Sequence, residues 1–228
     1  MQIRNFTSED YPALIAIHNS LNIVWPEQPR TPEAWAEADR RRNPKSRHQR
    51  WVAIEEGSVV GFAWYDQSPW SYPPQSFYVN VEVLPSHQRQ GIGSALYNQV
   101  IAELQGFNPP ALRADAFANL PQGFSFLQKR GFYEAFRETP VHLDVTAFDP
   151  SPYAGLEPKL EAEGIVIKTL RELASDPDRD RKVYDLYWEA DQDVPHEGDS
   201  IEKPDFKEWL GWGLNDASVL HDAYFIAV

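Results

Sequence analysis

A seven-residue segment with two glycines constrains this chain more than any other part of its sequence. The segment is Gln88-Arg89-Gln90-Gly91-Ile92-Gly93-Ser94, between a predicted strand over 76–84 and a run with helical periodicity over 94–104. A turn of this kind presents several backbone N–H groups to one point, where the helix dipole favours an anion. Gly91 and Gly93 lack the Cβ atoms that would block the approach. The pattern predicts an α/β fold with a diphosphate site at this turn.

The segment differs from two well-known phosphate-binding motifs. It has no third Gly in register for a dinucleotide fingerprint and no Gly-Lys-Ser/Thr of a P-loop. It resembles the Gln/Arg-x-x-Gly-x-Gly/Ala signature of the GNAT superfamily of acyl-CoA N-acyltransferases. Residues 81–85 are similar to the family's fourth strand with its following Pro, and residues 119–132 are similar to the block from an Asn to a Gly-Phe pair. The resemblance covers residues 1–148, with its specific motifs in 79–132, and implies the GNAT fold.

The resemblance implies an acyl-CoA cosubstrate, expected to be acetyl-CoA, and no metal. The pyrophosphate would lie on the backbone amides of the turn, and the pantetheine arm would lie along a bulged strand whose neighbour splays away. The Val83 N–H would polarise the thioester carbonyl, as an oxyanion hole does. The residues expected to bind the cosubstrate are Val81, Val83, Gln88, Arg89, Gln90, Gly91, Ile92, Gly93, Ser94 and Asn119.

The family's reaction is direct attack of a neutral amine on the thioester, which agrees with a chain that has no Cys. The base expected to take the amine proton is Glu82 or His87. Glu82 alternates with Val81 and Val83, so its side chain is expected on the opposite face of the sheet. The family's usual general acid is a Tyr, and Leu127 occupies that position here. A domain that binds acyl-CoA without turnover is therefore an alternative.

Acceptor specificity in this family comes from the first two helices and their loop. Aromatic and acidic side chains from that loop and from residues 64–72 would line the mouth of a pocket suited to an amine. Those residues are Trp25, Glu27, Trp64, Tyr65, Trp70 and Tyr72. The prediction is an acetyl-CoA-dependent N-acetyltransferase acting on a primary amine of a small molecule. A non-catalytic acyl-CoA-binding or sensing module and a protein or peptide N-acetyltransferase remain alternatives.

The other strands and helices follow from periodicity and capping residues. Thr7 and Thr31 are typical N-caps, and Pro32 suits the first position of a helix. Glu56-Gly57 predicts a hairpin, and Gly131 predicts the end of a helix. This order predicts an α/β domain with a mixed sheet. Strands are expected over 1–6, 50–55, 58–66, 76–84, 111–116, 132–137 and 141–146, and helices after Thr7, from Pro32, over 94–104 and over 120–130.

The later part of the sequence repeats the order of the first part. Residues 165–170 echo residues 1–6, and four later segments echo the first helix, its loop, the second helix and the second strand, with offsets from about 164 to 174. We predict a tandem duplication: residues 149–163 form a linker, and residues 164–228 form a partial second domain without the CoA-binding motif. The first domain or a second subunit of a homodimer is expected to cover its open strand edge.

Charge and composition bear on the possible partners. The net charge of −13 is concentrated in residues 149–228, with 8 basic and 19 acidic residues, so nucleic-acid binding is not expected. The acidic field favours a cationic acceptor such as a polyamine or an amino sugar, and a solvated surface is the alternative. Basic residues over 40–42, with Lys45, Arg47 and Arg50, suggest contact with the CoA 3′-phosphate, the acidic half or solvent. No signal peptide or membrane-spanning run is visible, which predicts a cytoplasmic protein without membrane contact.

Overall fold

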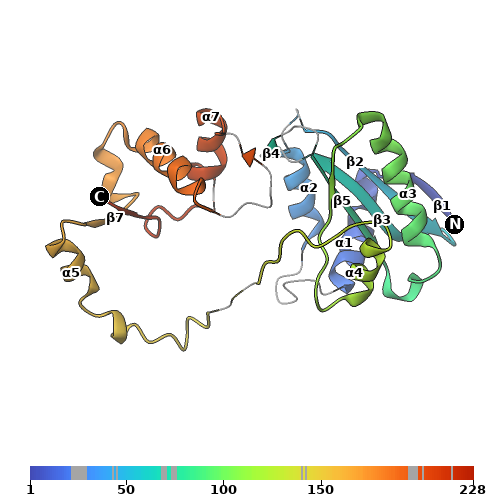
Figure 1. The fold of residues 1–228 in the computed structure, drawn as a ribbon, viewed down its shortest axis with the longest axis horizontal. Coiled ribbons are helices and arrows are strands. Elements are labelled where there is room, and N and C mark those ends of the chain that lie inside the picture. Colours follow the sequence, from blue (N-terminus) through green and yellow to red (C-terminus); the bar gives the residue numbers. More distant parts are fainter. Residues whose placement is uncertain are drawn as a thin grey trace. The chain divides into compact units, whose positions relative to one another are not determined.

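The structure is a computed structural model that divides into two compact units. One unit consists of residues 1–134 and 199–202, and the other of residues 135–198 and 203–228. Figure 1 labels the α-helices and most of the strands. The structure describes residues 1–21, 30–42, 44, 46–67, 71–72, 76–139, 141, 143–194, 200–201, 203–216 and 218–228.

The first unit contains a mixed sheet with helices packed against it. The sheet has the order β1-β2-β3-β5-β6, in which β5 and β6 are parallel and the other neighbours are antiparallel. The expected mixed α/β fold is therefore confirmed. The strands are β1 (Gln2–Asn5), β2 (His48–Glu55), β3 (Ser58–Gln67), β5 (Phe77–Val83) and β6 (Leu112–Arg113), while β4 (Ser71–Tyr72) pairs separately with β8 (Ser200–Ile201). The helices are α1 (Tyr11–Ser20), α2 (Pro32–Arg40), α3 (Ile92–Leu104) and α4 (Pro121–Gln128), with 3-10 turns η1 (Ser8–Asp10), η2 (Pro85–His87) and η3 (Gln105–Phe107).

Capping and turn residues place several of these elements where the sequence predicts them. The Thr31 hydroxyl accepts a hydrogen bond from the Ala34 N–H at 3.2 Å, and Pro32 is the first residue of α2. Glu56 and Gly57 connect β2 to β3 with φ angles of 49° and 81°. Positive φ at both positions is what a two-residue hairpin of type I′ requires.

Alternate strand residues point to opposite faces of the sheet, and each face has its own core. On the face that we call the α3 face, Trp51 and Val83 pack with the buried residues of α3. On the opposite face, Val52 and Phe62 pack with Leu14 of α1, and we call it the α1 face. Because β5 alternates, its even-numbered residues point toward the α1 face.

Residues 132–137 and 141–146 do not form the closing strands that their alternating pattern predicts. The described residues of these segments are not assigned to a strand. Val141, Leu143 and Val145 are exposed. A strand is stabilised by a hydrogen-bonded neighbour and by burial of one face, and these apolar side chains are not buried. The two expected strands are therefore wrong, and β6 is the last strand in the sheet order.

The second unit has a two-stranded sheet of β7 (Ile167–Thr169) and β9 (Phe225–Ala227). Its helices are α5 (Leu156–Ala162), α6 (Arg179–Asp191) and α7 (Phe206–Trp209), followed by a π-helical turn over Leu210–Leu214, and 3-10 turns lie at Ser151–Tyr153 and Glu172–Ser175. Helix α5 lies within the segment that the sequence predicts as a linker. The core contains Leu170, Val183, Tyr184, Trp209, Leu214 and Ile226.

The register of β7 with β9 can be compared with that of β1 with β2. Ile167 pairs with Ala227, as Ile3 pairs with Ala53 in the first unit. Ile167 lies 164 residues after Ile3, and Ala227 lies 174 residues after Ala53. These are the offsets of the corresponding sequence segments. The next two pairs, Lys168–Ile226 and Thr169–Phe225, correspond in the same way to Arg4–Val52 and Asn5–Trp51.

Candidate functional site

The glycine-rich turn leads from β5 into α3. Gly91 is the N-cap of α3 with a φ of 89°, in the left-handed region that favours glycine. Two side-chain amides hold the turn: Gln88 Nε2 donates to the Val83 carbonyl at 3.0 Å, and Gln90 Nε2 donates to the Ser86 carbonyl at 3.1 Å. The first N–H groups of a helix have no partner within the helix, so this turn can bind an anion.

A cation that sequence reasoning missed lies beside the first turn of α3. The Arg130 guanidinium donates to Ser94 Oγ at 2.8 Å and to the Phe126 carbonyl at 2.9 Å. It also lies 3.4 Å from the centre of the Phe126 ring. Arg89, the cation that the sequence singles out, is exposed with a φ of 64°. A positive charge fixed at a helix N-terminus strengthens the attraction for an anion.

One edge of β5 is open along most of its length. Strand β6 pairs with β5 at the first two residues of β5, so among the described strands residues 79–83 have no neighbour on that side. The Leu84 N–H donates to the Val60 carbonyl of β3, and the direction of backbone groups alternates along a strand. The Val83 N–H therefore points to the open edge.

The bulge expected in β5 is absent from its pairing with β3. The register of these two strands runs without a shift, whereas β2 and β3 have a shift between Ala53 and Ile54. A Cβ on Gly61 of β3 would lie 2.9 Å from the Glu82 carbonyl oxygen. Glycine at this position therefore permits the close pairing of β3 and β5.

Glu82 packs on the α1 face and contacts a histidine of α1. The Nδ1 atom of His18 lies 3.0 and 3.1 Å from the two Glu82 carboxylate oxygens. The Glu82 side chain is 6% exposed and that of His18 is 22% exposed, so the imidazole is the more accessible partner. An ionised carboxylate only accepts hydrogen bonds, so Nδ1 carries the hydrogen and Nε2 of a neutral His18 keeps its lone pair. Sequence reasoning missed His18, because 64 positions separate the two residues.

Two other expected residues of the site, His87 and Asn119, lie in turns and not in a strand or an α-helix. His87 is in η2, where its Nδ1 lies 2.9 Å from Ser86 Oγ. Asn119 is exposed in the turn before α4. Neither residue is held by a buried charged partner such as the one that fixes His18.

The position of the family's usual acid lies in α4 and carries no hydroxyl group, because it is Leu127. Tyr133 is 84% exposed. Tyr97 packs edge-on against Phe126 and Phe132, and burial raises the pKa of its hydroxyl. A raised pKa keeps this hydroxyl protonated, but its ring belongs to the packing between α3 and α4.

Part of the expected acceptor pocket lies outside the described residues. This applies to Trp25, Glu27 and Trp70, and to the side chain of Tyr72, whose backbone forms β4. Trp64 packs with the core of the α1 face. The expectation that Tyr65 lines the pocket is wrong, because this residue is 4% exposed and packs in the core of the α3 face. Consecutive strand residues point to opposite faces, so both cannot line one pocket.

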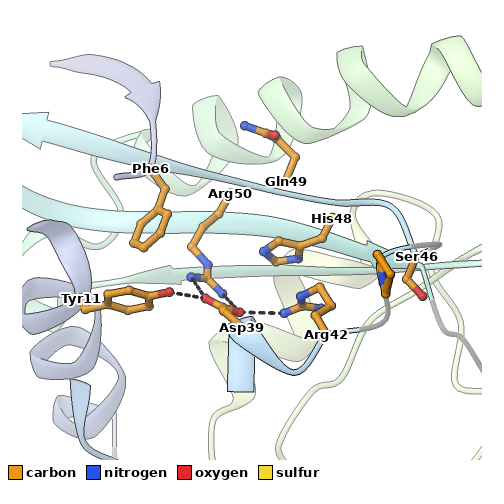
Figure 2. A pocket seen from close by; sticks show the side chains of 9 residues that line it. Phe6, Tyr11, Asp39, Arg42, Ser46, His48, Gln49 and Arg50 are labelled. Carbon is orange, nitrogen blue, oxygen red and sulfur yellow. Dashed lines mark hydrogen bonds and ion pairs between the residues drawn. The ribbon is translucent and has the colours of Figure 1, made fainter. Parts of the chain in front are cut away.

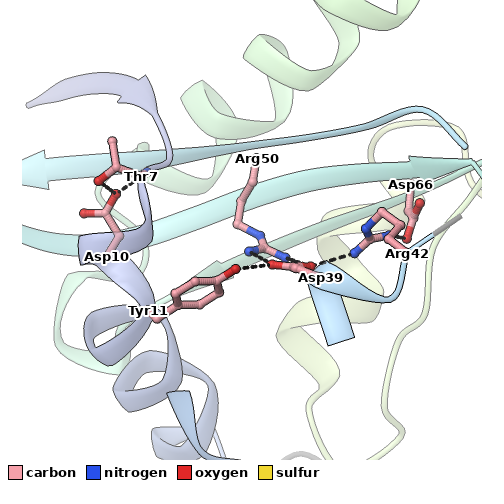
Figure 3. Close-up of polar contacts among 7 residues, drawn as sticks. All are labelled: Thr7, Asp10, Tyr11, Asp39, Arg42, Arg50 and Asp66. Atoms are coloured by element: carbon pink, nitrogen blue, oxygen red, sulfur yellow. Dashed lines mark hydrogen bonds and ion pairs between the residues drawn. The ribbon is translucent and has the colours of Figure 1, made fainter. Parts of the chain in front are cut away.

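A network of charges connects α2 to β2 and β3 on the α1 face (Figure 3). The Asp39 carboxylate accepts hydrogen bonds from the Tyr11 hydroxyl at 2.7 Å, from Arg42 at 2.9 Å and from Arg50 at 3.0 Å. Arg42 also pairs with Asp66. Four residues of the basic cluster expected around residues 40–50 thus pair with carboxylates, since Arg40 and Arg41 pair with Glu37.

A cavity of about 420 Å³ borders this network (Figure 2). Its lining includes Asp39, His48 and Arg50. Burial lowers the pKa of His48 to about 4, with a further contribution from the Arg42 and Arg50 cations, so this imidazole is neutral at neutral pH. The side chain of Arg50 is 2% exposed and lies 4.8 Å from the ring centres of both Phe6 and Trp35.

Two other kinds of feature are absent from the part of the chain that the structure describes. There is no group of three or more His, Asp or Glu side chains placed to hold a metal ion. Nor does this part contain a helix with the length and apolar character needed to cross a membrane.

Comparison with known proteins identifies the first unit. The acetyltransferase (GNAT) family matches residues 10–132, more than half of the chain. The structure is similar to that of an N-acetyltransferase from Staphylococcus aureus Mu50, with 28% identity and a TM-score of 0.50 over 57% of this chain and 82% of that chain. It is also similar to a ribosomal-protein-alanine N-acetyltransferase from Brucella melitensis, with 28% identity and a TM-score of 0.51 over 57% and 83%. Acetyl-CoA is the donor and amines are the acceptors in this family. The chain therefore belongs to the acetyltransferase (GNAT) family.

Proposed function

We propose that this chain is an acetyl-CoA-dependent N-acetyltransferase that acetylates a primary amine of a small molecule. The observation that carries the proposal is the His18–Glu82 pair. Glu82 directly precedes Val83, whose N–H points to the open edge of β5. A base and a hydrogen-bond donor for the carbonyl oxygen are the two groups that acyl transfer to an amine requires.

The residues around the turn fit the donor. Acetyl-CoA supplies the acetyl thioester. The N-terminus of α3 and the guanidinium of Arg130 would hold its diphosphate, because free N–H groups and a fixed cation both attract phosphate oxygens. The backbone groups of Val81 and Val83 at the open edge would hydrogen-bond to the pantetheine arm, as a neighbouring strand does.

The chemistry assigns one role to each group of the site. The amine nitrogen bonds to the carbonyl carbon and the bond from carbon to sulfur breaks. Nε2 of His18 takes the proton that the amine loses, and Glu82 stabilises the imidazolium. The Val83 N–H donates to the carbonyl oxygen as negative charge develops on it. Water protonates the thiolate, because Leu127 has no hydroxyl.

We also propose that residues 164–228 are a partial second GNAT-like domain, joined to a first domain of residues 1–148 through residues 149–163. The matched register of β7–β9 and β1–β2 supports a duplication. The glycine-rich turn occurs in the first copy, so one acetyl-CoA per chain is expected.

Release of free CoA tests the proposed activity. Incubation of the full chain with acetyl-CoA and a panel of small primary amines is expected to release CoA thiol in proportion to acetylated amine, measured with a thiol reagent and by mass spectrometry. A peptide with an N-terminal Ala belongs in the panel, because the Brucella relative is a ribosomal-protein-alanine N-acetyltransferase. Tight binding of acetyl-CoA without CoA release from any acceptor would favour a binding or sensing module instead.

The turn itself makes a separate prediction. Gly91→Ala places a Cβ at a φ of 89°, which strains the N-cap of α3 and moves the N–H groups that follow it. We expect the KM for acetyl-CoA to rise about tenfold, which corresponds to about 1.4 kcal/mol, with a smaller change in kcat. Gly106→Ala is the matched control, because Gly106 is exposed in η3 with open space around a Cβ and without a positive φ. Equal KM values for the two variants would contradict a role for this turn.

A further inference from the structure

The α1 face of the sheet contains four buried polar atoms without a hydrogen-bond partner. They are Nδ1 of His48, Nε of Arg50, Oδ1 of Asp66 and Oδ1 of Asn80. Among the described residues one other such atom occurs, Nε1 of Trp209 in the second unit. Buried polar atoms nearly always have partners in native proteins. Four on one face therefore mark a place where ordered water, or the polar group of a bound molecule, can complete the hydrogen bonding.

These four residues occupy two neighbouring rows of side chains that lead away from Glu82. Strand pairing places Glu82 beside Phe62 in one row. Successive rows on one face are two residues apart, or roughly 7 Å along a strand. Measured along the strands, the two rows therefore lie roughly 7 and 13 Å from the row that contains Glu82 and Phe62. The nearer row contains Arg50, Trp64 and Asn80, and the farther row contains His48, Asp66 and Tyr78.

The hydrogen-bonding atoms without a partner determine which chemical group the bound molecule must present. Oδ1 of Asn80 is an acceptor, and so is Oδ1 of an ionised Asp66. The two residues are diagonal neighbours on paired strands, so a single group can reach both. Around Asn80 and Asp66 the charges balance, because the cations of Arg42 and Arg50 lie against Asp39 and Asp66. Net charge therefore selects neither an anion nor a cation, and the selective feature is a hydrogen-bond donor.

We propose that the α1 face selects acceptor amines that carry a second hydrogen-bond donor, an amino or a hydroxyl group, remote from the reacting nitrogen. The reacting nitrogen lies at His18, and the second donor bonds to Oδ1 of Asn80 and Oδ1 of Asp66. A hydroxyl at this position also accepts from the Arg50 Nε–H, which no other described group satisfies. This inference rests on the proposed acetyltransferase activity and names its class of acceptor.

Three amines of equal chain length test this specificity: pentylamine, aminopentanol and cadaverine. With the full chain and saturating acetyl-CoA, we expect kcat/KM for aminopentanol and cadaverine to exceed that for pentylamine about tenfold, the effect of one added hydrogen bond to a buried partner. Because this comparison uses the wild-type chain, it does not depend on the folding of any variant. Calorimetry of the three amines is expected to give the same order of affinity.

Two substitutions assign the preference to the proposed residues. Asn80→Leu, of similar volume, is expected to reduce the preference for aminopentanol and cadaverine over pentylamine to less than about threefold. Asn98→Leu, on the exposed surface of α3, is the matched control and should retain the full preference. Asp66→Asn separates the two donors, since loss of its charge is expected to weaken cadaverine more than aminopentanol. Circular dichroism and melting curves establish that each variant is folded.

The outcomes separate this inference from the proposed function. Equal kcat/KM for the three amines, or an N-terminal peptide acetylated far faster than all of them, would overturn the inference and leave the transferase activity in place. An unchanged preference in folded Asn80→Leu would do the same. Absence of CoA release with every acceptor would instead overturn the proposed function, whatever the amines show in calorimetry.

Discussion

His18→Gln is expected to lower kcat/KM for amine acetylation by about 100-fold or more, the contribution of a positioned general base. The glutamine keeps a polar side chain of similar reach against Glu82 but cannot take a proton. Because acetyl-CoA contacts neither side chain in the proposed arrangement, its KM should change little and the loss should appear in kcat. Initial rates of CoA release at saturating acetyl-CoA measure it.

Three variants separate a catalytic His18 from a structural one. Imidazole added to His18→Ala should restore part of the activity, which a merely structural role would not permit. Glu82→Gln should lower kcat by a smaller factor, because the imidazole remains but its cation loses a buried carboxylate. His87→Gln tests the other base that the sequence suggests. A large loss in His87→Gln with normal rates in His18→Gln would reverse the assignment.

Much of the fold could be predicted because its determinants are local. Thr31-Pro32 and Glu56-Gly57 act through neighbouring residues, and the structure has a helix and a hairpin at these positions. The turn before α3 is local in the same sense, since glycines with a strand before and a helix after them specify its conformation. The sequence gives no such local signal for Arg130, which follows α4 and contacts Ser94 in the first turn of α3.

The contacts between side chains on the α1 face could not be predicted, because they join elements distant in sequence. His18 meets Glu82 across 64 positions, and Tyr11 meets Asp39 across 28. The strands predicted over 132–137 and 141–146 are wrong for a different reason, because their prediction used local sequence alone. The alternation of apolar and polar residues in these segments is typical of a strand. A strand also needs a hydrogen-bonded neighbour, and the alternation gives no information about whether a neighbour is present.

Asp39→Ala is expected to destabilise the first unit by about 3–5 kcal/mol, because it leaves the Arg50 cation buried without its carboxylate. The Arg50 side chain is 2% exposed. The rings of Phe6 and Trp35 lie against its guanidinium, but they cannot neutralise its charge as the Asp39 carboxylate does. Denaturation by urea, followed through the tryptophan fluorescence of the full chain, measures the change in the free energy of unfolding.

Two further variants identify the buried charge as the cause. Glu37→Ala removes an exposed carboxylate of the same helix that also pairs with arginines, and it should leave the unfolding midpoint nearly unchanged. The double variant Asp39→Leu with Arg50→Met removes both charges and should recover most of the stability. A double variant as unstable as Asp39→Ala would mean that lost packing, rather than an uncompensated cation, causes the effect.

The same carboxylate gives the stability a defined dependence on pH. Burial by itself would raise the pKa of Asp39, but hydrogen bonds from Tyr11, Arg42 and Arg50 outweigh it and lower the pKa from 3.8 to about 2. A carboxyl group whose pKa falls on folding stabilises the native state above its unfolded pKa, and this stabilisation is lost as the pH falls through the folded value. Between about pH 5 and about pH 2, the difference in unfolding free energy between the wild type and Asp39→Ala should therefore shrink by about 2 kcal/mol. A difference that stays constant over this range would mean that Asp39 is not held ionised by the network.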